Sequence, residues 1–77
     1  MSRIVSNNIA VHRAAKGISQ QKLAAAIGVS RKTISTIETG RFTPSVQIAL
    51  CIAEYFNTSV ESIFRLEEPS NKLIHTK

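Results

Sequence analysis

Several kinds of residue and segment are scarce in this sequence, and each shortage excludes a class of protein. A single cysteine, Cys51, excludes an internal disulfide and any zinc site built from several cysteines. No apolar run approaches the roughly 20 residues that a membrane-spanning helix needs. The N-terminal residues have no long apolar segment, so we expect no signal peptide. A reducing cytoplasm is the simplest location for such a chain.

The chain also has few of the side chains that make catalytic or metal sites. Its two histidines, His12 and His75, have no partners at the spacing of metal ligands. The sequence contains no nucleophile elbow and no phosphate-binding loop. We therefore expect no enzymatic activity, no cofactor and no metal ion.

Acidic residues are scarce, and they are unevenly distributed. The net charge is +5 at pH 7. Residues 1–44 carry seven cationic side chains and a single acid, Glu38, whereas residues 45–77 carry three cations and four acids. A basic half of this kind is typical of a surface that neutralises DNA phosphates, but an ordinary soluble surface can look the same. Charge alone does not decide between the two interpretations.

The length of the chain sets its domain organisation. Its 77 residues are enough for one small domain, and we expect a single domain over residues 1–77. Hydrophobic residues make up 43% of the sequence, which is ordinary for a folded protein and too many for a disordered one. A domain of this size buries only about 60–65% of its unfolded surface, and dimerisation is one way to bury more.

Two short helical patterns lie in the basic half, separated by three residues. Ser19 and Ser30 can each cap a helix, and Gly28 can end the first one because glycine readily adopts the left-handed conformation found at helix C-termini. The apolar residues at helical spacing are Leu23, Ala24, Ile27, Ile34 and Ile37. Two helices joined by a short turn with glycine are typical of a helix-turn-helix motif, here over residues 20–39.

The other segments predict three helices in addition to the two of the motif, which makes five in all. We expect helices from a Ser6 or Asn7 cap to about Lys16, over about 20–27, 31–38 and 46–56, and a short one through Val60, Ile63 and Phe64. For the helix over 46–56, we expect the core face to consist of Val46, Ala49, Leu50, Ala53 and Phe56. The predicted fold class is all-α, a compact five-helix domain.

The two ends of the chain are less clearly patterned. Residues 1–7 are compatible with a helix, a strand or a loose arm, and residues 65–68 can form a short C-terminal strand. We assign residues 69–71 to a turn and the last six residues to a tail.

The motif and its surroundings resemble the Cro/phage-repressor type of helix-turn-helix, also called the xenobiotic-response-element family. The resemblance covers about residues 9–64, and the positions that fit the pattern are Arg13, Gly17, Ile18, Ser19, Gln20, Leu23, Ala24, Ile27, Gly28, Val29, Ser30, Ile34, Ser35, Ile37, Glu38, Gly40, Arg41, Pro44 and Ser45. It implies a repressor-like core over about 8–64 and a transcriptional regulator that binds double-stranded DNA. An antitoxin with a toxin partner and a restriction–modification controller share this fold. A protein-interaction module that has lost DNA binding is the alternative from another class.

The resemblance also implies roles for individual residues. In this family the third helix lies in the major groove with its N-terminal residues at the base edges. The implied base contacts are Arg31, Lys32, Thr36 and Ser35, and the implied phosphate contact is Gln20. From their positions on and after the third helix, we add Thr33, Arg41 and Thr43 as predicted phosphate contacts. Arginine can bind guanine O6 and N7, and threonine can touch a thymine methyl or a base edge. Arg31 and Lys32 could instead hold only phosphates. The family further implies an ion pair between Arg13 and Glu38.

A homodimer is expected for two reasons. Phage-repressor relatives bind two half-sites about 34–36 Å apart as dimers. In addition, Ile48, Cys51 and Tyr55 occupy positions that are usually polar in the family, and they form a second apolar stripe on the helix over 46–56. Either the terminal segments or a second chain must cover this stripe. We expect an interface that includes these three residues together with Phe64 and Leu66.

Overall fold

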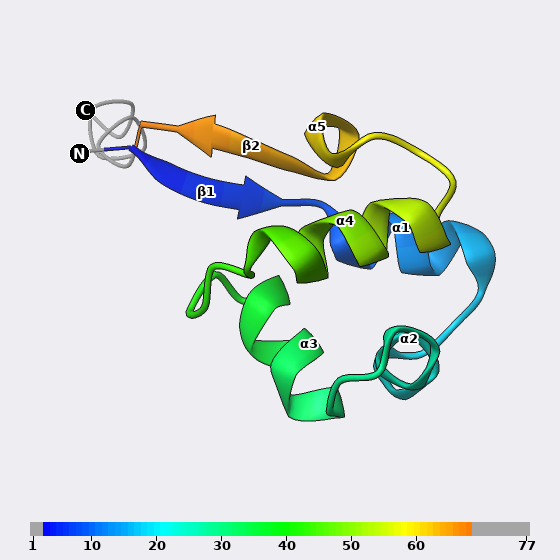
Figure 1. The fold of residues 1–77 in the computed structure, drawn as a ribbon. Helices are drawn as coiled ribbons and strands as arrows, with labels where there is room; N and C mark the ends of the chain where they lie inside the picture. Colours follow the sequence, from blue (N-terminus) through cyan, green and yellow to red (C-terminus); the bar gives the residue numbers. More distant parts are fainter. Residues whose placement is uncertain (1–2, 69–77) are drawn as a thin grey trace.

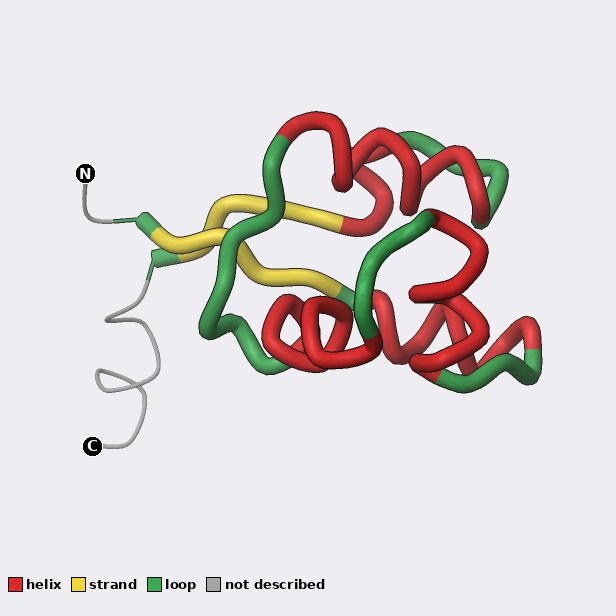
Figure 2. The backbone as a smooth tube through the Cα atoms, turned by 60° about the horizontal axis from the view of Figure 1, so that its bottom comes forward, coloured by secondary structure: helices red, strands yellow, loops and turns green. Residues whose placement is uncertain are grey.

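Five helices and a two-stranded antiparallel sheet make up residues 3–68, the part of the chain that the computed structural model describes. The elements in chain order are β1 (Ile4–Asn7), α1 (Ile9–Lys16), α2 (Gln20–Ile27), α3 (Arg31–Glu38), α4 (Val46–Tyr55), α5 (Val60–Ile63) and β2 (Phe64–Glu67). The sheet extends from one end of the helical body, as both views show (Figure 1; Figure 2).

Serine side chains fix the starts of four helices. The hydroxyls accept hydrogen bonds from the backbone N–H three residues further along, and the capping residues are Ser19 for α2, Ser30 for α3, Ser45 for α4 and Ser59 for α5. These bonds satisfy N–H groups that have no partner within the helix. Gly28 ends α2 with a left-handed backbone, φ 81°. The predicted boundaries of α2, α3 and α4 are confirmed to within one residue.

The core is built from nearly every element. Its buried apolar residues are Ile9, Leu23, Ala24, Ile34, Ile37, Ile52, Ala53, Ile63 and Phe64. Both helices of the helix-turn-helix contribute, so the motif rests on α1, α4 and α5. Helices of eight residues are too short to be stable alone in water, and this shared burial holds them in place.

The core face of α4 differs from the expected one. Val46 and Leu50 were expected in the core but are 77% and 55% exposed. The residues of α4 that are buried or packed on the core are Ile48, Ala49, Ile52, Ala53 and Tyr55. Almost every residue of this helix is apolar, so apolar spacing does not determine its rotation. The polar residues Gln47 and Glu54 are exposed, and helical spacing puts them on the same side as Val46 and Leu50.

The N-terminal residues form a strand, one of the three alternatives that the sequence allowed. β1 pairs with β2 so that Ile4 lies opposite Glu67 and Asn7 lies opposite Phe64. The predicted C-terminal strand is confirmed, although it begins at Phe64, which we expected in the last helix. The expected turn at 69–71 and the expected tail lie outside the described residues.

Asn7 connects the sheet to the helices. Its side-chain Oδ1 accepts a hydrogen bond from the backbone N–H of Ile9 at 3.1 Å, and its Nδ2 donates to the carbonyl of Ile37 at 2.9 Å. Asn8 is the N-cap residue of α1, but its side chain makes no capping hydrogen bond. The Asn7 side chain therefore joins β1, the start of α1 and the end of α3.

The variant Asn7→Ala should destabilise the domain by about 1–3 kcal/mol, because two hydrogen bonds to backbone groups are lost. The change is measured by urea denaturation at equilibrium. Ser6→Ala, one position earlier on β1, is the matched control and should change the free energy of unfolding by less than about 0.5 kcal/mol. If both variants unfold at the same urea concentration as the natural protein, these two bonds do not hold the sheet in place.

Candidate nucleic-acid interface

The candidate interface is centred on α3, whose two sides differ sharply. Ile34 and Ile37 are completely buried and fix the inner side of the helix. Residues on the opposite side lie away from the core because an α-helix repeats every 3.6 residues. Of the four residues predicted to contact bases, Arg31 and Lys32 are exposed and Ser35 and Thr36 are half-buried. All four are thus reachable from outside the domain.

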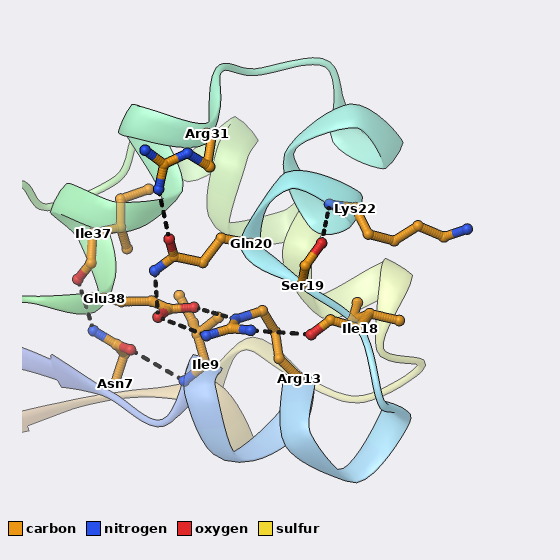
Figure 3. A network of polar contacts seen from close by, with 10 residues as sticks. All are labelled: Asn7, Ile9, Arg13, Ile18, Ser19, Gln20, Lys22, Arg31, Ile37 and Glu38. Carbon is orange, nitrogen blue, oxygen red and sulfur yellow. Dashed lines mark hydrogen bonds and ion pairs between the residues drawn. The ribbon is translucent and has the colours of Figure 1, made fainter.

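An ion pair between Arg13 on α1 and Glu38 at the end of α3 lies beside this helix (Figure 3). The Nε of Arg13 is 2.6 Å from Oε2 of Glu38, and Nη2 is 3.2 Å from Oε1, so the contact has two parallel hydrogen bonds. The remaining nitrogen, Nη1, donates to the carbonyl of Ile18 at 3.0 Å. Only 19% of the Arg13 side chain and 9% of the Glu38 side chain are exposed.

The pair controls the charge near α3. The hydrogen bond to Glu38 raises the pKa of the Arg13 guanidinium, burial opposes this, and the attraction of the Glu38 charge adds to it. Arg13 is therefore protonated at every ordinary pH. A carboxylate at the end of α3 would repel DNA if it were unpaired, and the guanidinium compensates its charge.

Gln20, a predicted phosphate contact, lies between this ion pair and the start of α3. Its Nε2 donates to Oε1 of Glu38 at 3.0 Å, and its Oε1 accepts a hydrogen bond from Nη1 of Arg31 at 3.3 Å. A continuous series of polar contacts thus runs from Arg13 to Arg31 (Figure 3). Sequence reasoning missed both contacts of Gln20, because they join the start of α2 to opposite ends of α3.

The other predicted phosphate contacts are spread along α3 and the loop after it. The hydroxyl of Thr33 is 3.0 Å from that of Ser30, so it belongs to the cap of α3. Arg41 and Thr43 are exposed in the following loop. Thr43 also lines an open groove beside β1, together with Arg3.

Within residues 3–68, no group of three histidine, cysteine or acidic side chains is placed to hold a metal ion. No helix in the same range is long and apolar enough to cross a membrane. Apart from the Glu38 carboxylate, which is paired with Arg13, the polar groups gathered around α3 are hydrogen-bond donors, hydroxyls and amides, which suit recognition of DNA.

The helix-turn-helix family matches residues 9–63. The chain belongs to this family. The predicted Cro/phage-repressor type is confirmed, and so is the prediction of a DNA-binding helix-turn-helix regulator at the level of the family. Helix-turn-helix proteins of this kind place the second helix of the motif, here α3, in the major groove.

Two relatives align with this helix-turn-helix protein over nearly their whole length. The uncharacterized HTH-type transcriptional regulator MJ0272 from Methanocaldococcus jannaschii is 39% identical over 83% of this chain and 97% of its own length. The uncharacterized HTH-type transcriptional regulator YgzD from Bacillus subtilis is 41% identical with the same coverage.

Solved structures share the fold. The restriction–modification controller protein C.AhdI from Aeromonas hydrophila has a TM-score of 0.66 and 28% identity, over 70% of this chain and 82% of that one. The transcriptional regulator VanUg has a TM-score of 0.75 at 23% identity, over 88% of this chain and 91% of that one, and shows likeness of fold alone.

The five residues expected at a dimer interface differ in how far they are buried within a single copy of the chain. Phe64 is buried in the chain's own core, and Ile48 and Tyr55 are partly buried against it. Cys51 is half-buried beside a shallow hollow between α2 and α4. Leu66 is 52% exposed. A single copy of the chain therefore already covers most of the stripe that led us to expect an interface.

The apolar side chains that α4 does expose are Val46 and Leu50, which lie one helical turn apart. Sequence reasoning missed this surface because it placed both residues in the core. The signal that could have found it is the pair Gln47 and Glu54, polar residues that mark the solvent side of an otherwise apolar helix.

The variant Glu38→Gln should destabilise the domain by about 2–3 kcal/mol, between the values typical of surface pairs and of buried pairs broken on one side. It leaves the Arg13 charge without its counter-ion in a poorly exposed position. Thermal and urea unfolding measure the effect. Glu54→Gln removes an exposed carboxylate and is the matched control, expected within about 0.5 kcal/mol of the natural protein. Equal stability of both variants would mean that the ion pair does not support the fold.

Proposed function

We propose that this helix-turn-helix protein regulates transcription by binding a two-fold symmetric operator as a homodimer, with α3 of each copy in the major groove. The observation that carries the proposal is the outer side of α3, where Arg31 and Lys32 are exposed while two isoleucines anchor the inner side. The base contacts in this proposal are Arg31, Lys32, Ser35 and Thr36.

Phosphate contacts on either side of the groove complete the proposed interface. The second N–H of the Gln20 amide can reach a phosphate while the first stays on Glu38. Arg41 and Thr43 extend the interface beyond α3, and Thr33 sits at its start. Because Arg13 compensates the one acid in this half of the chain, the proposed surface is positive overall.

We propose a homodimer because the DNA-binding surface of one copy is small. One recognition helix contacts only a few base pairs, and two copies related by a two-fold axis read a palindrome with half-sites one helical turn apart. For the interface we propose Val46 and Leu50 on α4 together with Leu66 on β2, which are the exposed apolar residues of these elements. Ile48, Tyr55 and Phe64 would support this surface from the core side, and Cys51 would lie at its edge.

A restriction–modification controller is a second candidate, supported by the likeness to C.AhdI. Both candidates act by binding DNA, and the genes beside this one would separate them. Neither needs catalysis, and we propose no enzymatic activity. Since the proposed partner is DNA, we place the protein in the cytoplasm.

An electrophoretic mobility shift with DNA from upstream of the gene tests the interface. The variant Arg31→Ala/Lys32→Ala should bind at least about thirtyfold more weakly, because each contact to a base or phosphate contributes roughly 1–3 kcal/mol. Lys16→Ala/Arg65→Ala removes the same charge elsewhere and should weaken binding only a few-fold. An equal loss in both variants would indicate attraction by net charge without recognition by α3.

Sedimentation at tens of micromolar protein, without DNA, tests the dimer. The natural chain should sediment as a dimer and Leu50→Glu as a monomer, because a charge on the proposed interface would be buried without a partner. Val11→Glu alters another exposed apolar residue, on α1, which is 66% exposed against 55% for Leu50, and should stay dimeric. A natural chain that sediments as a monomer rules out the proposed assembly.

A further inference from the structure

An open groove runs along the free edge of β1. One wall consists of residues 3–7, which are Arg3 and the whole of β1, and no residue of β2 lines the groove. The other wall is the end of α3 and the loop after it, at Glu38, Thr39, Gly40 and Thr43. In Figure 1 this loop lies on the side of β1 that faces away from β2. The groove has a volume of about 540 Å³.

The backbone of β1 offers hydrogen bonds to this groove. The N–H of Asn8 donates to the carbonyl of Ile63 at 3.0 Å, in register with the ladder between β1 and β2. Hydrogen-bonded pairs alternate along an antiparallel ladder, so every second residue of β1 turns its N–H and C=O away from β2. These residues are Val5 and Asn7. An edge of this kind can take an extended peptide as an additional strand.

The two walls of the groove are fixed to each other. Asn7 belongs to the strand wall, and its Nδ2 donates to the carbonyl of Ile37 at 2.9 Å, directly before the wall formed by the end of α3. The groove therefore exists before anything binds, and a preformed site costs less conformational entropy on binding. Five extended residues span roughly 17 Å, so the strand wall can pair with a segment of about the same length.

The charge that this groove presents is positive. Glu38 is the only acid in the lining, and both of its oxygens are engaged by other side chains. Arg3 lies 4.0 Å from Glu68, and 55% and 51% of these side chains are exposed, so this ion pair contributes little. Arg41 is exposed in the loop of the opposite wall. Both arginines are thus available to carboxylates of a binding partner.

We infer that this groove binds an extended, acidic segment of a partner protein, which adds to β1 as a third strand and places a carboxylate on Arg3. Main-chain hydrogen bonds to Val5 and Asn7 hold the segment, and its charge selects it. A second copy of the chain fits less well, because its β1 has no carboxylate to offer. A DNA phosphate fits less well because it has no donor for the outward carbonyls of β1.

The test begins with selection from a phage-displayed library of short random peptides by the natural protein. The selected peptides should carry Asp or Glu and β-branched residues. Synthetic copies are then N-methylated at one backbone nitrogen at a time, and their affinity is measured by calorimetry. Methylation at alternate positions should weaken binding at least about tenfold, because only every second N–H faces β1. Equal tolerance at all positions refutes strand addition, and failure to select any peptide overturns the inference. No DNA is present, so the outcome is independent of the proposed function.

Two matched pairs of variants place the peptide on the groove. Val5→Pro removes an outward N–H that the ladder with β2 does not use, and it should weaken peptide binding about tenfold, whereas Val5→Ala keeps that N–H and should bind within a few-fold of the natural protein. Urea unfolding checks that both are folded. Arg3→Glu should weaken binding about fivefold, and Arg65→Glu, the same change on β2 outside the groove, should have little effect. Equal losses in Arg3→Glu and Arg65→Glu would indicate attraction by net charge alone.

The remaining measurements identify other occupants of the groove or other sites for the peptide. Arg31→Ala/Lys32→Ala should bind the peptide as the natural protein does, and a loss there would place the peptide on α3. If Val5→Pro changes a sedimenting dimer into a monomer, a second copy of the chain fills the groove. If Val5→Pro weakens DNA binding as strongly as peptide binding, the DNA backbone fills it. Each of these three results overturns the inference.

Discussion

The ion pair between Arg13 and Glu38 is the interaction on which the rest of the candidate interface depends. It ties the first helix to the far end of α3, with one short contact of 2.6 Å and little exposure to water. It compensates the only negative charge in the first 44 residues, where free acid would oppose DNA. It also holds the carboxylate that orients Gln20. A pair that adds modest net stability can in this way shape a whole surface.

A small number of specific contacts also holds the short helices together. Each helix of the motif has eight residues, and neither would persist alone in water. Serine caps fix where they start, while buried side chains from α1, α4 and α5 fix how they lie. Asn7 adds a polar connection from the sheet to the carbonyl of Ile37. The recognition helix is thus supported along its inner side and near its C-terminal end.

Local signals explain why so much of this fold could be predicted from the sequence. The caps and the glycine after α2 act within a few residues, so they define the helix boundaries directly. The rotation of α4 could not be derived from apolar spacing, because nearly all its residues are apolar. The pairing of β1 with β2 and the two contacts of Gln20 join residues far apart in the chain. Such contacts leave no periodic pattern, and only the folded arrangement reveals them.

The pairing of β1 with β2 has a consequence for how the protein is made. A ribosome produces residues 4–7 early and their partners at 64–67 some sixty residues later, with all five helices in between. The first strand has no partner until the second one is synthesised, and the core lacks Ile63 and Phe64 until the same point. An interrupted chain therefore keeps an open strand edge, of the kind that pairs with other chains and leads to aggregation.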